Sequence, residues 1–143
     1  MIKQSGAVPI QFQNDEPMFL VINNLNRTRW LVPKGIVEEG LTLAETAVKE
    51  AMEEAGITGE ILAQPLGVYT YRKWDDVCSV DLFILFVKKI YDTWEEDNFR
   101  ERRWINWMEF LEIVDKRIPR SLLDKIPEVL NMTNNLKKKE TRP

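Results

Sequence analysis

Three glutamates stand in a spacing that can do chemistry. Glu50, Glu53 and Glu54 are placed i, i+3, i+4 along the sequence, so on a helix they project from one side. Like charges at this spacing destabilise an exposed helix by about 0.2–0.5 kcal/mol. A hard divalent cation such as magnesium, which prefers oxygen ligands, would offset that repulsion. The spacing alone leaves a second interpretation open, a solvated helix face on which Lys49 pairs with Glu45 and Glu53.

The chain restricts which other groups can act. It contains no histidine, and Cys78 is its only cysteine. A general base must therefore be a carboxylate, a lysine, a tyrosine or water, and imidazole-ligated zinc sites are excluded. We expect Cys78 to be a thiol in the core or a strand rather than a nucleophile. An internal disulfide is impossible, which fits a reducing compartment, and we predict a cytoplasmic location.

The glutamates belong to a helix whose two ends are marked. Thr42 and Glu45 form a T-x-x-E capping box at the start, and Gly56 follows the last periodic residue, where a left-handed conformation favours glycine. The remaining face is apolar and mostly small, with Leu43, Ala44, Ala47, Val48, Ala51 and Ala55. This pattern predicts a short helix that packs closely on a sheet.

The stretch from Pro33 to Ile57 resembles the signature of the Nudix hydrolases. The family pattern is G-x5-E-x7-R-E-U-x-E-E-x-G-U, where U is a bulky aliphatic residue. Gly35 matches its first glycine, and Lys49 to Ile57 align with its last nine positions, in which the three glutamates and the glycine match. Three positions depart from the pattern: Leu41 replaces a glutamate, Lys49 replaces an arginine, and Ala51 is small. In the family the missing glutamate and arginine support the loop, so we expect that support to be absent or rebuilt.

Lys49 is the residue that can rebuild the support. It can pair with Glu38, Glu39 or Glu45 in place of the family's ion pair. The departures at Leu41 and Lys49 therefore bear on the rigidity of the loop and on rate more than on family membership.

The resemblance also implies a fold, a reaction and a cofactor. Nudix proteins are α/β/α sandwiches that hydrolyse a diphosphate linkage with divalent metal ions, so we expect Mg²⁺ or Mn²⁺ here. It implies that Glu50 and Glu54 are side-chain metal ligands and that the Gly35 carbonyl is a further ligand. Glu53 is then the candidate for the base or for a ligand of a metal-bound water. The implied enzyme is a phosphoanhydride hydrolase of the EC 3.6.1 type.

Substrate contacts are expected to be basic. Lys34 directly precedes Gly35, and Arg27, Arg29 and Arg72 stand at loop or strand ends that can face the same cleft. Arginine suits bidentate binding of phosphate. A surface position is the alternative for each of these four side chains.

The charged segment 94–103 offers further groups. Glu96 and Glu101 are candidates for an extra site carboxylate, because Nudix families differ in where the base comes from; a solvated loop is the alternative. Arg100 can join a phosphate-binding patch or be solvated. Trp94, like Trp74, can stack on a base or cover a hydrophobic edge.

Two segments resemble one branch of the family. The opening Pro33-Lys34-Gly35 and the pattern W-E-x-D…R-x-x-R-W over residues 94–104 are similar to the branch acting on diphosphoinositol polyphosphates and dinucleoside polyphosphates. A heavily phosphorylated small molecule is the substrate that this likeness implies. The alternatives are a nucleoside triphosphate, an mRNA-end pyrophosphate, and a module that binds nucleotides or polyphosphates without hydrolysing them.

The order of apolar runs predicts an α+β fold with a mixed sheet between helices. The expected strands are Ser5–Phe12, interrupted or placed at an edge by Pro9, then Met18–Asn23, Arg29–Val32, Ile61–Tyr71, Val80–Ile90 and Trp104–Trp107. The expected later helices are Met108–Val114 and Pro119–Met132, the second kinked or restarted at Pro127.

The 143 residues suffice for one domain. We assign residues 1–133 to it and residues 134–143 to a frayed basic tail. No apolar run reaches the roughly 18–20 residues of a membrane span. We therefore expect a monomer or homodimer that binds a small molecule and neither a membrane nor nucleic acid.

Overall fold

The computed structural model describes residues 1–132, and one eight-stranded sheet forms its centre. The elements in chain order are β1 (Ile2–Gln13), β2 (Glu16–Asn23), β3 (Trp30–Leu31), β4 (Lys34–Ile36), α1 (Leu43–Ala55), β5 (Ile57–Ile61), β6 (Gly67–Lys73), β7 (Asp76–Ile90), β8 (Arg102–Ile105), α2 (Trp107–Ile113) and α3 (Arg120–Leu123). The strand order is β3-β2-β1-β7-β5, with β4 beside β1, β6 beside β7 and β8 beside β2. The β1–β7 pair is parallel and the other pairs are antiparallel.

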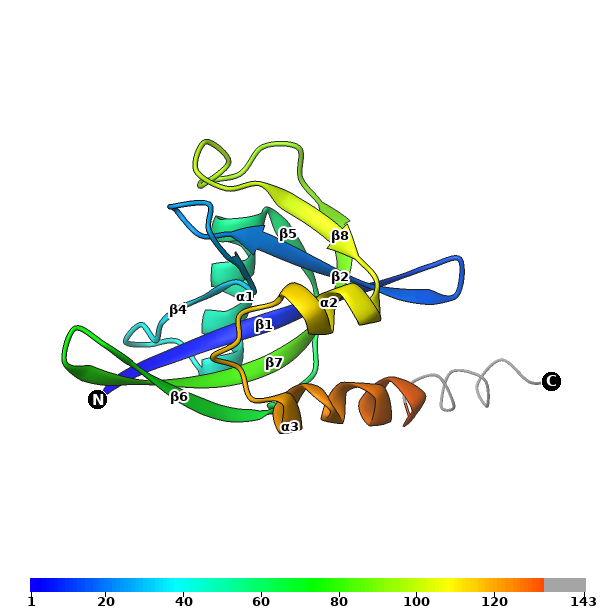
Figure 1. Ribbon diagram of the computed structural model, residues 1–143. Helices are drawn as coiled ribbons and strands as arrows, with labels where there is room; N and C mark the ends of the chain where they lie inside the picture. The colour runs from blue at the N-terminus through cyan, green and yellow to red at the C-terminus, as the bar shows by residue number, and fades with distance from the viewer. Residues whose placement is uncertain (133–143) are drawn as a thin grey trace.

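Helices cover both faces of the sheet (Figure 1). Neighbouring residues of a strand point to opposite faces, and the core divides accordingly. Ala7 packs in the cluster that contains the buried alanines of α1, whereas Val8 packs in the cluster that contains Phe110 of α2 and Leu122 of α3. The predicted mixed sheet between helices is therefore confirmed.

Pro9 neither interrupts β1 nor lies at an edge, contrary to the prediction. β1 is central and pairs with β7 without a break from Ile2 to Ile10. On its other side, the paired residues of β4 end opposite Gly6 and those of β2 begin opposite Ile10. Pro9 lies in this gap between two partner strands. The proline nitrogen cannot donate a hydrogen bond, and none is needed there because no antiparallel partner lies opposite.

The predicted strand Ile61–Tyr71 is wrong as a single element. β5 ends at Ile61 and β6 begins at Gly67, and both strands pair with β7. The turn from β6 to β7 is also tighter than expected, since Trp74 and Asp75 alone form it, both with positive φ. Such left-handed pairs match the twist of a two-residue hairpin.

The C-terminal helix is broken, but three residues before Pro127. α3 ends at Leu123, Asp124 forms a turn, and residues 125–132 are helical again. Pro127 then falls in the first turn of the second segment, where its missing N–H costs no helical hydrogen bond.

Helix α1 has the predicted ends. The Thr42 hydroxyl accepts from the Glu45 amide and the Glu45 carboxylate accepts from the Thr42 amide, which completes the capping box. Gly56 ends the helix with φ 64°, in the left-handed region. The glutamates of α1 are thus held on a helix whose start and end are both fixed.

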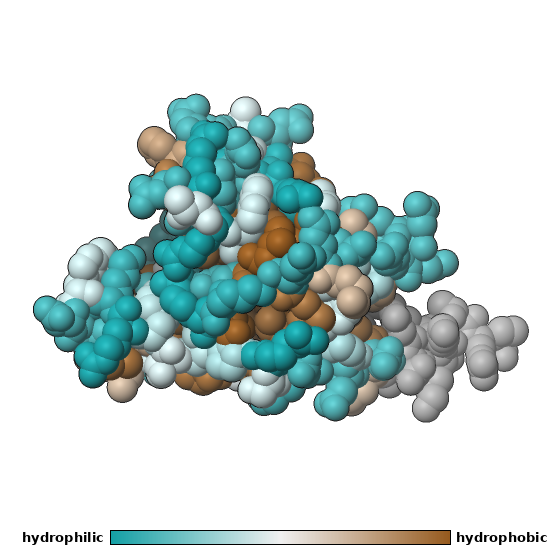
Figure 2. Space-filling model, in the orientation of Figure 1, coloured by the Kyte–Doolittle hydropathy of each residue, from teal (hydrophilic) through white to brown (hydrophobic). Residues whose placement is uncertain are grey.

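The sheet face that carries α2 and α3 is hydrophilic at its rim and hydrophobic near its middle (Figure 2). None of the helices described within residues 1–132 is long and apolar enough to cross a membrane. The predicted basic tail, residues 134–143, lies outside the described residues.

Candidate active site

Gly35 of β4 lies directly against Glu50, near the middle of α1. Gly35 pairs with Ser5 of the central strand β1, and the Ser5 hydroxyl donates to the Leu43 carbonyl at the start of α1, at 2.6 Å. A Cβ atom added to Gly35 would overlap the carboxyl group of Glu50. Any side chain at position 35 would therefore displace the Glu50 carboxyl from its present place.

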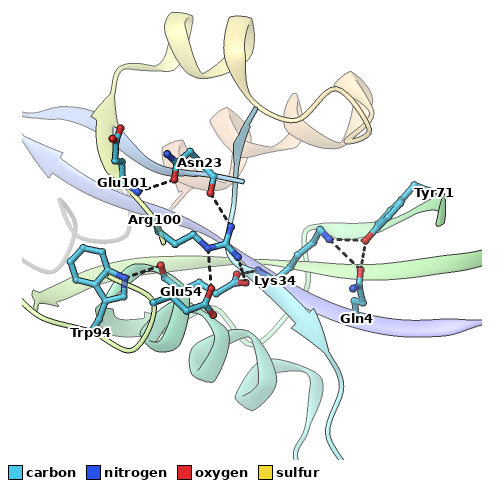
Figure 3. A network of polar contacts seen from close by, with 9 residues as sticks. Gln4, Asn23, Lys34, Glu54, Tyr71, Trp94, Arg100 and Glu101 are labelled. Carbon is cyan, nitrogen blue, oxygen red and sulfur yellow. Dashed lines mark hydrogen bonds and ion pairs between the residues drawn. The ribbon is translucent and has the colours of Figure 1, made fainter. Parts of the chain in front are cut away.

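Glu54 is fixed from two directions. Its Oε1 accepts from the Lys34 amide at 2.9 Å, and its Oε2 accepts from Arg100 Nη2 at 3.1 Å. Arg100 also donates to the Asn23 carbonyl at 2.9 Å (Figure 3). The Glu54 side chain is only 12% exposed. Burial raises the pKa of its carboxyl to about 8, even though Arg100 opposes that rise.

Glu50, one turn before Glu54, is also partly buried and close to other acidic side chains. Burial, and then the charge of Glu53, raise the pKa of the Glu50 carboxyl to about 7. The charge of Glu50 also raises the pKa of Glu54, and the charge of Glu96 raises the pKa of both. Desolvated carboxylates that repel one another are stabilised by a nearby cation.

The donor set fits a hard divalent cation. Glu50, Glu54 and the backbone of Gly35 offer only oxygen, which Mg²⁺ and Mn²⁺ prefer. Within residues 1–132 no three side chains of the ligand types His, Cys, Asp and Glu already form a metal-binding group. The fit therefore rests on two side chains, a backbone carbonyl and the crowding of carboxylates around them.

The segment 91–102 caps the C-terminal end of α1. The last carbonyls of a helix have no partner within the helix, yet here each of four successive ones accepts a hydrogen bond. The pairs are Glu53 O with Glu96 N at 3.1 Å, Glu54 O with Trp94 Nε1 at 3.0 Å, Ala55 O with Arg102 Nη1 at 3.0 Å, and Gly56 O with Tyr91 N at 2.8 Å. This capping brings Glu96 and Arg100 beside the glutamates of α1.

The two extra carboxylates have different surroundings. Glu96 Oε1 accepts from Arg100 Nε at 3.0 Å, and its charge acts on both Glu50 and Glu54. Glu101 instead pairs with Arg27 at 2.8 Å, and both side chains are 58% exposed. Only Glu96 of the two is brought to the cluster.

Lys49 supplies an ion pair for the loop. Its Nζ lies 2.6 Å from Glu38 and 2.7 Å from Glu53, and these hydrogen bonds raise the pKa of Lys49. Of the predicted partners Glu38, Glu39 and Glu45, Glu38 is the one that pairs with Lys49. Glu45 is engaged in the capping box instead, so the alternative of a Lys49–Glu45 pair is wrong.

A basic pocket opens beside Glu54. Its cavity measures about 590 Å³, and the charged residues that line it are Arg29, Lys34, Glu54, Arg72, Lys73, Arg100 and Arg117. Three of the four predicted substrate-binding residues are among them. Arg27 is not, because it is paired with Glu101.

Sequence reasoning missed Arg117 as a pocket residue. Arg117 follows α2, far along the chain from the signature, and no local pattern marks it. The Arg117 guanidinium binds the buried Asp115 carboxylate at 2.9–3.1 Å. A buried acidic partner fixes the direction of an arginine, but such a partner becomes visible only in three dimensions.

Trp94 has a structural role at the end of α1. Its ring packs on the Arg102 guanidinium, whose carbon lies 3.8 Å from the ring centre, and its indole nitrogen binds α1. Trp74 is 78% exposed at the tip of the β6–β7 turn. Trp94 is therefore part of the helix cap rather than a free stacking surface. Cys78 is buried in β7, as expected.

Known proteins share this arrangement. Residues 3–126 match the family model of the NUDIX domain. The curated protein Nudix hydrolase 13, mitochondrial, of Arabidopsis thaliana is 32% identical, and the match covers 88% of this chain and 73% of that protein. Diphosphoinositol polyphosphate phosphohydrolase 3-alpha of Mus musculus is 26% identical over 82% of this chain and 71% of its own length.

A solved structure agrees with the fold. The Ap4A hydrolase of C. elegans in a binary complex superimposes with a TM-score of 0.77, at 23% identity, over 92% of this chain and 98% of that one. Fold and relatives define the class, a hydrolase of phosphoanhydride bonds. The chain belongs to the Nudix family.

Proposed function

We propose that the chain hydrolyses a phosphoanhydride bond in a nucleoside- or inositol-polyphosphate and that the reaction depends on Mg²⁺ or Mn²⁺. The observation that carries the proposal is the pocket beside Glu54, in which six cationic side chains face one carboxylate among the described lining residues. An anion with several phosphates is the ligand that such a wall complements. The names of the mouse and nematode relatives support the same class of substrate.

Glu50 and Glu54 would hold the cation, together with the Gly35 carbonyl. A divalent cation bound there would neutralise phosphate charge and lower the pKa of a bound water. The Lys34 amide and Arg100 hold the Glu54 carboxylate in place. Arg29, Lys34, Arg72 and Arg100 would then bind the phosphates on the pocket side.

Glu53 is the proposed proton acceptor. It lies about one turn after Glu50 and directly before Glu54 on α1, and the Lys49 ammonium holds its carboxylate at 2.7 Å. Glu96 is the second candidate, since its charge reaches both ligands. A base that acts in the transition state contributes roughly 10²–10⁴-fold.

A phosphate-release screen tests the proposal. Dinucleoside polyphosphates, nucleoside triphosphates, capped RNA ends and diphosphoinositol polyphosphates are offered with Mg²⁺ or Mn²⁺, and one label from ¹⁸O-water is expected in a phosphate product. Glu54→Gln should abolish release and weaken the rise in melting temperature that the metal produces. Glu60→Gln, an exposed glutamate on β5, is the matched control.

Two outcomes would change the assignment. Tight binding of these compounds by the wild-type protein, without release from any of them with either metal, would show a binding module. Phosphate release from nucleoside triphosphates alone, or from capped RNA ends alone, would identify that compound class as the substrate instead. A cytoplasmic location and a monomeric or homodimeric state remain predictions.

A further inference from the structure

Tyr71 connects Lys34 and Gln4, two residues that line the pocket. It lies on β6 with its side chain buried. Its hydroxyl accepts a hydrogen bond from Lys34 Nζ at 2.7 Å and donates one to Gln4 Oε1 at 2.7 Å (Figure 3). The direction of these bonds is fixed, because an ammonium group only donates and an amide oxygen only accepts. Tyr71 therefore orients the Lys34 ammonium.

The ring of Tyr71 also carries Arg117. The guanidinium carbon lies 4.2 Å from the ring centre, within the range of a cation–π contact, and Lys34 Nζ lies 4.7 Å from the same centre. Arg117 is held from its other side by the Asp115 carboxylate, which is 3% exposed. Two cations from distant parts of the chain are thus fixed against one aromatic ring.

Lys34 places this pair on the other face of β4 from the Gly35–Glu50 contact. Its backbone amide binds Glu54, whereas its ammonium binds Tyr71. Lys34 is opposite Gly6 on β1, and Gly35 is opposite Ser5, so the two side-chain positions of β4 point to opposite faces of the sheet. The Lys34–Arg117 pair is therefore separated from the Gly35–Glu50 contact by the strand itself.

We propose that Tyr71 is a positioning residue that holds Lys34 and Arg117 as a subsite for a phosphate group which is not cleaved. This inference rests on the proposed function and narrows it to substrates with a phosphate beyond the two of the scissile anhydride. Both cations line the pocket, and an anion between them offsets their mutual repulsion. If Tyr71 served only to fill the core, its hydroxyl would not need to accept a hydrogen bond from Lys34.

Binding of inorganic tripolyphosphate in the presence of EDTA tests the subsite apart from hydrolysis. Titration calorimetry should show binding to the wild-type protein without metal, because the pair needs none. Tyr71→Phe keeps the ring and loses the hydroxyl, and it should weaken binding about three- to tenfold, within the typical net range of one intramolecular hydrogen bond. Arg117→Gln should weaken it at least as much. Arg120→Gln removes one exposed charge on α3 and should leave it unchanged.

A double-mutant cycle separates positioning from general packing. If Tyr71 acts through Lys34, adding Tyr71→Phe to Lys34→Gln should weaken binding little further, whereas adding it to Arg120→Gln should weaken it fully. Gln4→Ala removes the acceptor of the hydroxyl and also the 3.4 Å bond that Lys34 Nζ donates to Gln4 Oε1, so it should weaken binding at least as much as Tyr71→Phe. In steady-state kinetics with the active substrate, Tyr71→Phe should raise KM by a similar factor and change kcat less than twofold.

Three results would overturn the inference. In the first, the wild-type protein does not bind tripolyphosphate without metal. In the second, the Tyr71→Phe variant binds it as tightly as the wild type. In the third, the effects of Tyr71→Phe and Lys34→Gln on binding are strictly additive. Each can occur while metal-dependent hydrolysis is intact, so failure of the subsite is distinguishable from failure of the proposed function. Thermal melts of every variant show that the fold persists.

Discussion

The indole nitrogen of Trp94 donates a hydrogen bond to the backbone carbonyl of Glu54 at 3.0 Å. Trp94 lies forty residues further along the chain, in a charged loop, while Glu54 lies in the last turn of α1. This bond ties the loop that carries Glu96 and Arg100 to the helix that carries the proposed metal ligands. The loop and the helix end therefore form one unit of the site.

Trp94→Phe should loosen that unit. Phenylalanine keeps the apolar packing and loses the hydrogen bond, which leaves a helix carbonyl without its partner. We expect a loss of about 1–2 kcal/mol in unfolding free energy and a smaller rise in melting temperature with Mg²⁺. Trp74→Phe, at the exposed tip of the β6–β7 turn, is the matched control and should stay within about 0.5 kcal/mol of wild type. Equal effects of the two changes would contradict this role of Trp94.

Gly35→Ala should damage the site and spare the fold. The new methyl group overlaps the Glu50 carboxyl, so Glu50 must move, and a displacement near 1 Å at a catalytic group can cost about 10²-fold in rate. The rise in melting temperature with Mg²⁺ should disappear. Gly40→Ala meets open space but a φ of 88°, so it should cost about 1–2 kcal/mol of stability and keep the metal response. A normal metal response in Gly35→Ala would remove Gly35 and Glu50 from the proposed site.

The metal-free protein should become less stable as pH rises from 5.5 to 7.5. Burial raises the pKa of Glu50 to about 7 and that of Glu54 to about 8, from an ordinary 4.5. The folded state then binds more protons than the unfolded chain in this window, so the stabilisation present at low pH is lost as pH rises through these values. Melting temperatures in EDTA measure the effect, and Glu50→Gln should flatten the curve. Because a bound cation favours the ionised carboxyls, Mg²⁺ should also stabilise more at pH 7.5 than at pH 5.5. A melting temperature independent of pH in EDTA would contradict these shifts.

Glu53→Gln should lower kcat by roughly 10²–10⁴-fold, the contribution of a general base. Binding of the substrate should change little, because Lys49 keeps its second partner Glu38. Glu96→Gln is the comparison, since both carboxylates lie beside the proposed ligands. If Glu53→Gln keeps near-wild-type turnover and Glu96→Gln loses it, the base is Glu96.

Leu41→Glu should couple to Lys49→Arg. Leu41 and Lys49 line one shallow groove beside α1, and the double change would restore the family's residues at both positions. We expect a coupling of roughly 0.5–1 kcal/mol in a cycle of unfolding free energies. Leu41→Gln paired with Lys49→Arg is the uncharged control and should be additive. Strict additivity of the charged pair would show that the two positions do not communicate.

Sequence by itself determined the helix and its carboxylates. The capping box at Thr42, the glycine at position 56 and the spacing of Glu50, Glu53 and Glu54 are local properties, set by one helix period and by backbone conformation. The same holds for Gly35, which the signature identifies. The two-faced sheet also follows from the order of apolar runs, because strands with continuous apolar runs, such as β2 and β7, must bury both faces.

Tertiary structure decided which charges join these carboxylates. In the sequence Glu96 and Glu101 were equal candidates; the hydrogen bonds between the loop and the α1 carbonyls bring Glu96 to the cluster, and Arg27 holds Glu101 away. Arg117 could not be found locally, since its direction depends on the buried Asp115 and on the ring of Tyr71. Pairing across a sheet and capping of a helix end join residues that are distant in the chain, and long-range contacts of this kind leave no periodic pattern in the sequence.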